Sequence, residues 1–188
     1  MYLHTKKELR ARFLAYREQI SKEAKKTLDA RICDALLDLD EVKNARNILV
    51  YAPFRNEIDL YPFFDRLYAM GKKTAFPKCG KDGVMEFFFC DHSTLSEQAY
   101  GIKEPTDLSE KFCGDEDSIC ILPCLAITSD GYRLGYGGGY YDRFLEKNSI
   151  KKIAAVYSGF VLKNERFEKS DFDIPADIII TEEEIIRL

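Results

Sequence analysis

The first residues of the chain carry apolar side chains spaced three or four residues apart. They predict one amphipathic helix over residues 5–20 and a second that begins after Ser21. Ser21 followed by Glu23 is typical of a helix start. The continuous apolar run in residues 47–52 then predicts a strand that is buried on both faces. Two helices are therefore expected before the first strand.

Beyond residue 52, helix-like and strand-like patterns alternate. A helix is expected over residues 60–70, and Thr181–Glu184 fits a capping box that opens a short terminal helix. Short apolar runs predict further strands at residues 74–76, 84–90, 119–122, 153–157 and 177–180. This alternation predicts an α/β fold, with a mostly parallel sheet flanked by helices on both faces.

Composition narrows the class of protein. A chain of 188 residues, 46% of them hydrophobic, fits a single domain over residues 1–188. The net charge of −4 argues against broad binding of nucleic acid or membrane surfaces. Six scattered cysteines without a C-x-x-C pair, with only two histidines, argue against zinc and fit a reducing cytosol. Neither a signal peptide nor an apolar run of membrane length is visible. We therefore expect a cytoplasmic protein whose partners are small molecules. We also expect a monomer, although composition gives no sign of the oligomeric state.

The segment Arg133–Arg143, with the sequence RLGYGGGYYDR, carries the clearest chemical signal. Its glycines at 135, 137, 138 and 139 allow positive φ and let backbone N–H groups converge on an anion. The helix expected over residues 140–147 would direct its positive end at the same anion. Both arginines can bond phosphate, and Asp142 offers the hard oxygen that magnesium prefers.

A flexible surface turn is the alternative interpretation of this segment. No Walker lysine follows the glycines, and no G-x-G-x-x-G stands in the proper order behind a strand. The glycine run alone therefore indicates an anion without identifying it.

Charged residues elsewhere offer further candidates. Lys6, Arg10 and Arg17 share one face of the first helix, either as a solvated basic face or as phosphate contacts. Glu57, in the loop after the first buried strand, can accept hydrogen bonds from a ligand's N–H groups or cap the helix that begins near Ile58. Glu104–Pro105 favours a rigid turn, with a ligand role second.

Taken together, these segments resemble the 5-formyltetrahydrofolate cyclo-ligase family, also called methenyltetrahydrofolate synthetases. The resemblance covers nearly the whole chain, and its long glycine motif is highly specific. The matching segments are Lys6–Arg10, Tyr51–Asp59, Gly101–Pro105, Asp130–Arg143 and Asp173–Asp177.

The resemblance implies an ATP- and magnesium-dependent closure of 5-formyltetrahydrofolate to 5,10-methenyltetrahydrofolate, with release of ADP and phosphate. The γ-phosphoryl group would pass to the formyl oxygen, and the distal nitrogen would then attack the activated carbon. No protein nucleophile is required, which agrees with the lack of a Ser-His or Cys-His arrangement in this sequence.

The resemblance also implies roles for individual residues. The expected ATP contacts are Lys6, Lys7, Arg10, Arg133, Leu134, Gly135, Tyr136, Gly137, Gly138, Gly139, Tyr140 and Tyr141, of which Arg133 and Tyr141 are also assigned to catalysis. The expected folate contacts are Ala52, Glu57, Tyr136, Gly137, Gly138, Gly139 and Tyr140. The expected metal ligands are Asp142 and Asp173, with Asp171 and Asp177 as alternatives to the second.

Tyr136 and Gly138 stand where some members of that family have basic residues, so phosphate affinity would depend more on the backbone here. Two other classes stay open at this point. One is a phosphosugar isomerase or transferase on a similar scaffold, which would ignore ATP. The other is a nucleotide-binding protein without turnover, which would leave folate unchanged.

Overall fold

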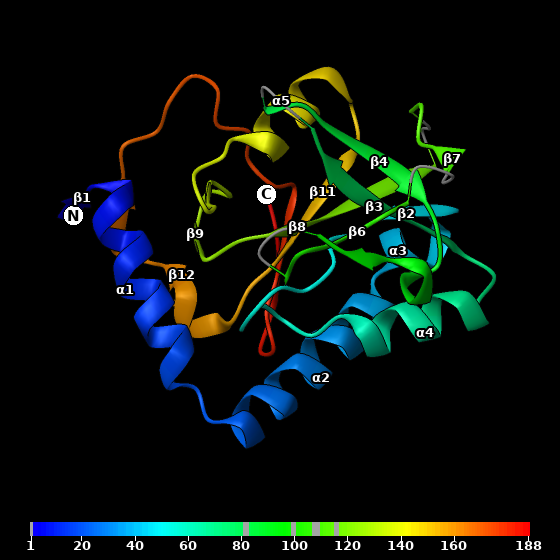
Figure 1. The fold of residues 1–188 in the computed structure, drawn as a ribbon. Helices are drawn as coiled ribbons and strands as arrows, with labels where there is room; N and C mark the ends of the chain where they lie inside the picture. Colours follow the sequence, from blue (N-terminus) through cyan, green and yellow to red (C-terminus); the bar gives the residue numbers. More distant parts are fainter. Residues whose placement is uncertain (1, 81–82, 99–100, 107–109, 115–116) are drawn as a thin grey trace.

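The computed structural model describes residues 2–80, 83–98, 101–106, 110–114 and 117–188 (Figure 1). Both helices expected at the amino terminus are confirmed. Ser21 accepts a hydrogen bond from the Ala24 amide at 3.2 Å and so caps the second helix. The helices are α1 (Lys6–Gln19), α2 (Lys22–Asp38), α3 (Asp40–Asn44), α4 (Tyr61–Ala69) and α5 (Tyr140–Lys147), with short 3₁₀ turns η2 (His92–Thr94) and η4 (Ser158–Phe160).

Within the described residues, the main sheet has eight strands in the order β15-β14-β11-β8-β2-β3-β4-β7. Strands β14, β11, β8, β2 and β3 run parallel, while β15, β4 and β7 add antiparallel strands at the two edges. The mostly parallel sheet is thus confirmed. Their bounds are β2 Asn47–Leu49, β3 Lys73–Cys79, β4 Met85–Phe89, β7 Glu110–Lys111, β8 Ser118–Pro123, β11 Lys151–Ala155, β14 Ile178–Ile180 and β15 Ile185–Arg187.

Helices cover both faces of this sheet. Figure 1 shows α2, α3 and α4 along one side of the strands and α5 on the other. Helix α2 packs against α4 and β14, and α5 packs against β4. Strands β2 and β14 are buried along their whole length. This is the reason for their continuous apolar sequences, because helices leave neither face to solvent.

Three smaller sheets frame the main one. The first pairs β1 (Tyr2–His4) with β13 (Glu165–Phe167) in parallel, which ties the start of α1 to a distant part of the chain. The second joins β9 (Ala126–Thr128), β10 (Arg133–Leu134) and β12 (Val161–Leu162). The third pairs β5 (Ser96–Glu97) with β6 (Lys103–Glu104).

The expectation of a short terminal helix was wrong. Residues Ile185–Arg187 form the edge strand β15, antiparallel to β14. The Thr181 hydroxyl does accept bonds from the amides of Glu183 and Glu184, but it closes the turn of this hairpin rather than a helix. The strand expected over residues 47–52 is also shorter than expected and ends at Leu49. It is not the first strand, because β1 (Tyr2–His4) precedes both amino-terminal helices. Of the helices that the structure describes, none is long and apolar enough to cross a membrane.

Candidate active site

A cavity of about 500 Å³ opens at the carboxyl ends of the parallel strands. This is where ligands bind in open α/β sheets. Its wall comes from α1, the loop after β2, the ends of β3 and β8, the glycine run and the start of α5. The lining residues are Lys6, Arg10, Tyr51, Ala52, Phe54, Glu57, Pro77, Cys79, Met85, Ile102, Lys103, Glu104, Pro123, Arg133, Gly135, Tyr136, Gly137, Gly138, Gly139, Tyr140, Tyr141, Asp142 and Asp173.

The structure brings most of the expected site residues to this cavity. Two of the expected ATP contacts do not line it, because the Lys7 side chain is exposed to solvent and Leu134 is fully buried. Among the alternative acids, Asp173 lines the cavity, whereas Asp171 is exposed and Asp177 pairs with Lys152. The ligand roles of these residues stay predictions.

The glycine run turns into α5 through left-handed backbone. Gly137 has φ of +103°, and Gly139, the N-cap of α5, has φ of +65°. Gly135 and Gly138 do not use the positive φ that glycine allows. A Cβ at Gly138 would instead lie 2.7 Å from the ring of Tyr140, so packing explains the glycine there. The amino terminus of α5, with the positive end of its dipole, borders the cavity.

Arg143, which could bond phosphate by its place in the motif, instead bonds two backbone carbonyls in this structure. Its guanidinium donates to the carbonyls of Gly83 at 2.9 Å and Gly138 at 2.6 Å, and it does not line the cavity. Arg143 therefore holds the glycine run from outside the cavity.

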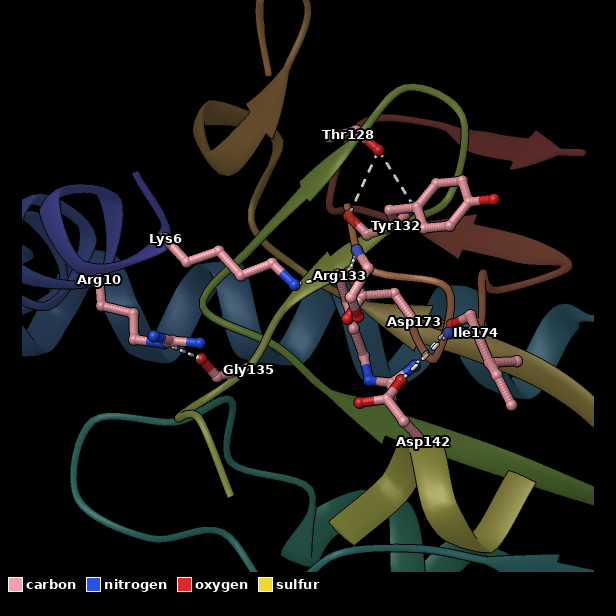
Figure 2. A network of polar contacts seen from close by, with 10 residues as sticks. Lys6, Arg10, Thr128, Tyr132, Arg133, Gly135, Asp142, Asp173 and Ile174 are labelled. Atoms are coloured by element: carbon pink, nitrogen blue, oxygen red, sulfur yellow. Dashed lines mark hydrogen bonds and ion pairs between the residues drawn. The ribbon is translucent and has the colours of Figure 1, made fainter. Parts of the chain in front are cut away.

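Two side chains of α1 reach the cavity from the amino-terminal side (Figure 2). Lys6 Nζ lies 2.5 Å from Asp173 Oδ2, and Arg10 Nε donates to the Gly135 carbonyl at 2.8 Å. Burial acts to raise the pKa of Asp173, but the hydrogen bonds from Lys6 and Ser170, together with the charge of Lys6, outweigh it, so the pKa lies below its ordinary value. Asp173 is therefore a carboxylate at neutral pH.

A second ion pair joins β10 to α5. Arg133 Nη2 donates to Asp142 Oδ1 at 2.7 Å, and Arg133 Nη1 donates to the Ile174 carbonyl at 2.9 Å (Figure 2). The Ile174 amide donates to the same Asp142 oxygen at 3.2 Å. The Arg133 side chain is only 5% exposed. Each of the two expected metal ligands is thus paired with a cation, and the described residues contain no cluster of three metal-binding side chains.

Glu57 is a buried acid in the wall of the cavity, 8% exposed. Burial raises its pKa, while bonds from the Phe54 amide at 2.8 Å and from the Tyr136 hydroxyl act in the opposite direction. The capping alternative was wrong, because α4 begins at Tyr61 and the Tyr61 amide bonds to Asp59 instead. Glu57 therefore does not cap α4, and it lines the cavity, where a ligand can meet it.

Tyr141 places a buried hydroxyl at the cavity. Among the described residues this hydroxyl has no hydrogen-bond partner, and burial raises its pKa well above the ordinary value. The Arg133 guanidinium lies 5.9 Å from the centre of its ring. A protonated phenol without a partner is a ready donor for a ligand oxygen.

Several features of the site had no clear signal in the sequence. Arg17 is not part of a solvated basic face: it is 4% exposed and donates to the Tyr136 hydroxyl. Glu104 lies in β6 rather than in a rigid turn and accepts a bond from the Cys79 amide at 3.1 Å. An apolar wall completes the cavity, formed by Phe54, Pro77, Met85 and Ile102. Its residues come from separate segments, and the segments singled out in the sequence contain only Phe54 and Ile102 of them.

The cavity has no activated nucleophile among its described residues. Cys79 lines it, but burial raises the pKa of the thiol, which disfavours the reactive thiolate. An anion-receptive end, formed by the glycine run and basic side chains, adjoins an apolar wall that carries one buried acid. Such an arrangement suits positioning of two ligands more than covalent catalysis.

Comparison with known proteins points to one family. Residues 3–182 match the family model of the 5-formyltetrahydrofolate cyclo-ligases. A probable 5-formyltetrahydrofolate cyclo-ligase of Schizosaccharomyces pombe is 28% identical, over 83% of this chain and 84% of the relative. The solved 5,10-methenyltetrahydrofolate synthetase of Aquifex aeolicus superposes with a TM-score of 0.83 at 32% identity, covering 97% of this chain and 92% of that one. The synthetase of Mycoplasma pneumoniae gives a TM-score of 0.77 at 26% identity, over 95% and 99% of the two chains.

Proposed function

Since the chain belongs to the 5-formyltetrahydrofolate cyclo-ligase family, and so to a family of enzymes, we propose that it couples closure of 5-formyltetrahydrofolate to the cleavage of ATP. The product is 5,10-methenyltetrahydrofolate, and ADP and phosphate are released. One observation carries the proposal: a single cavity joins the glycine run at the start of α5 to the buried acid Glu57.

The nucleotide end of the cavity is assigned from charge. Lys6 and Arg10 of α1 face the glycine run, and the amino terminus of α5 adds the positive end of its dipole. Because Arg10 already bonds the Gly135 carbonyl, it ties α1 to the loop that would receive the phosphates. Tyr136 and Gly138 bring no basic side chain, so backbone N–H groups provide much of the phosphate contact.

The folate end is assigned from the opposite properties. Glu57 is buried beside apolar side chains, so a ligand that offers N–H groups would be held by charge-assisted bonds in a site with little water. A flat, partly apolar pterin ring carries such groups. Phe54 and Met85 supply apolar surface against which that ring can pack.

The described residues fit a magnesium ion that is carried with the nucleotide. Magnesium is usually held by one or two carboxylates together with substrate phosphates, and Asp142 and Asp173 offer two such carboxylates in one cavity. Magnesium would neutralise negative charge on the transferred phosphoryl group. Lys6 and Arg133, which now pair with these acids, would then be available to phosphate oxygens.

The reaction places the two ligands in line. The formyl oxygen attacks the γ-phosphorus of ATP, and ADP leaves. The distal nitrogen of the folate then attacks the formyl carbon and loses its proton, and phosphate departs with the former formyl oxygen. Tyr141 and Arg133 are assigned to the charge that develops on the transferred group, because the hydroxyl is an unpartnered donor and the guanidinium lies 5.9 Å from the centre of the Tyr141 ring.

The experiment follows the absorbance of 5,10-methenyltetrahydrofolate in mixtures that lack one component. We expect product only when 5-formyltetrahydrofolate, ATP and magnesium are all present. Product without ATP would refute the coupling to ATP. Binding of ATP without product would show a nucleotide-binding protein instead, and binding of a phosphosugar without effect of ATP would favour the phosphosugar class.

A further inference from the structure

Arg17 is a buried cation without a direct counter-charge. It lies in the last turn of α1 and is 4% exposed. Its guanidinium donates to the Cys124 carbonyl at 2.8 Å and to the Tyr136 hydroxyl at 3.1 Å. No carboxylate of the described residues lies within ion-pair distance of it. Burial of an unpaired charge costs several kcal/mol, so its retention here calls for a physical reason.

Glu57 is the matching buried anion. It is 8% exposed, and within the described ranges no cation lies within ion-pair distance of it either. Its contacts are the Phe54 amide, at 2.8 Å, and the Tyr136 hydroxyl. Arg17 and Glu57 are therefore opposite buried charges, and both bond the same phenol.

The chemistry of the three groups fixes the direction of these bonds. A guanidinium only donates, so the Tyr136 oxygen must accept from Arg17. The phenol has one proton, which is then directed to the Glu57 carboxylate, an acceptor. Donation by a cation polarises the hydroxyl and strengthens the bond that it makes in turn. A single line of hydrogen bonds thus runs from the end of α1 to the wall of the cavity.

The placement of Tyr136 gives this line a function. Tyr136 as a whole is 50% exposed and lines the cavity, while its hydroxyl points inward to the buried side chains of Arg17 and Glu57. Without Arg17, no guanidinium would hold the Tyr136 hydroxyl in place. The Tyr136 ring and the Glu57 side chain would then be less fixed in the cavity wall that meets the ligand. The Cys124 carbonyl holds the guanidinium from the other side.

We propose that Arg17 is a positioning residue for the folate end of the site, acting through the Tyr136 hydroxyl on the carboxylate of Glu57. The inference rests on the proposed function, because it takes Glu57 as the folate acid. Arg17 itself does not line the cavity, so it acts without contact to substrate.

The test is a double-mutant cycle with Arg17→Met and Tyr136→Phe, each measured for the KM of both substrates. Each single variant should raise the folate KM roughly tenfold, the effect of one charge-assisted hydrogen bond, while the ATP KM stays within about twofold. The double variant should resemble the single variants, because the second change removes a bond that the first has already broken. Effects that multiply, or equal changes in both KM values, would overturn the proposal.

Arg12→Met is the matched control. Arg12 belongs to the same helix and is partly buried, but it pairs with Glu165 and does not line the cavity. It should leave both KM values unchanged. A selective rise of the folate KM in this variant would show that any loss of a guanidinium from α1 disturbs the site, and the proposal would fail.

A second variant protects the test against loss of folding. If Arg17→Met does not fold, the cycle is repeated with Arg17→Lys, whose single ammonium cannot reproduce a fork that reaches two separate acceptors. The Arg17→Lys variant should again raise the folate KM and not the ATP KM, by a smaller factor. Its effect on the folate KM should again not multiply with that of Tyr136→Phe. Failure of either expectation would overturn the proposal. Wild-type turnover separates the two claims: no product from the wild type refutes the proposed function, whereas normal turnover with an unselective Arg17 variant refutes this inference alone.

Discussion

Asp142→Asn is the most informative single change, because it removes a charge and leaves the shape. The amide keeps the oxygen that accepts from Arg133 at 2.7 Å and from the Ile174 amide at 3.2 Å. What disappears is the negative charge opposite a guanidinium whose side chain is 5% exposed. The variant therefore separates the hydrogen-bonding role of Asp142 in the fold from its proposed role as a magnesium ligand.

The structural loss can be sized from these contacts. A hydrogen bond to a charged group contributes about 1.5–3 kcal/mol, against about 0.5–1.5 kcal/mol for a neutral one. We expect the free energy of unfolding to fall by about 1–2 kcal/mol, which for a chain of this length lowers Tm by about 2–8 °C. A residue that acted only on the helix dipole would contribute about 0.3–1 kcal/mol.

The catalytic loss should be much larger. As a magnesium ligand, Asp142 would act on the phosphoryl group during transfer, where a metal supplies several kcal/mol of charge stabilisation. We expect kcat to fall by roughly a hundredfold or more, with a raised magnesium requirement that manganese partly relieves, since manganese binds such sites more tightly.

The assay is a magnesium titration of turnover in the wild type, in Asp142→Asn and in the control Asp171→Asn, each with its Tm. Asp171 is a neighbouring acid that is exposed and does not line the cavity, so its curve should match that of the wild type. Superimposable curves for Asp142→Asn and wild type, with a lowered Tm, would refute the metal role. Asp142 would then serve to hold Arg133.

Two further variants and one pH profile test other parts of the site. Glu57→Gln should raise the folate KM roughly tenfold to hundredfold, with little effect on the ATP KM, because a charged hydrogen bond contributes about 1.5–3 kcal/mol. Gly138→Val should abolish ATP binding with a modest change in Tm, since its Cβ would lie 2.7 Å from the Tyr140 ring in the cavity wall. Burial raises the pKa of Glu57 in the folded chain, so its contribution to stability is full below the ordinary glutamate pKa and is lost as pH rises through the raised value. Urea unfolding should show this decline in wild type and not in Glu57→Gln.

Each of these predictions has an opposite outcome. Equal changes in both KM values would show that Glu57 supports the whole site rather than the folate end. Normal ATP affinity in folded Gly138→Val would remove the glycine run from the nucleotide site. Parallel pH profiles of stability for wild type and Glu57→Gln would show that burial does not disfavour the Glu57 carboxylate.

Features that depend on local sequence were predictable. The Ser21 cap, the helix after the glycine run and the parallel strands follow from spacing and turn chemistry within a few residues. The terminal helix was mispredicted because an acidic turn looks alike before a helix and within a hairpin. Strand β14 can pair with one more strand at the sheet edge, and its pairing with Ile185–Arg187 favours the hairpin over the helix.

Features that depend on distant contacts were not predictable from the sequence. Lys6 meets Asp173 although 167 positions separate them, and the β1–β13 pair that docks α1 had no signal. Arg17 has the helical spacing of Lys6 and Arg10, so only the packing of α1 shows that it is buried. Arg143 flanks the motif as Arg133 does, yet it bonds the Gly83 carbonyl and lies outside the cavity.

Transfer of the γ-phosphoryl group to the formyl oxygen is the central claim, and an isotope label tests it directly. 5-Formyltetrahydrofolate labelled with oxygen-18 in the formyl group is converted with unlabelled ATP in ordinary water, and the released phosphate is analysed by mass. The account predicts one labelled oxygen in each phosphate, formed together with one ADP and one 5,10-methenyltetrahydrofolate. Unlabelled phosphate alongside the same product, with the label recovered in water, would contradict it.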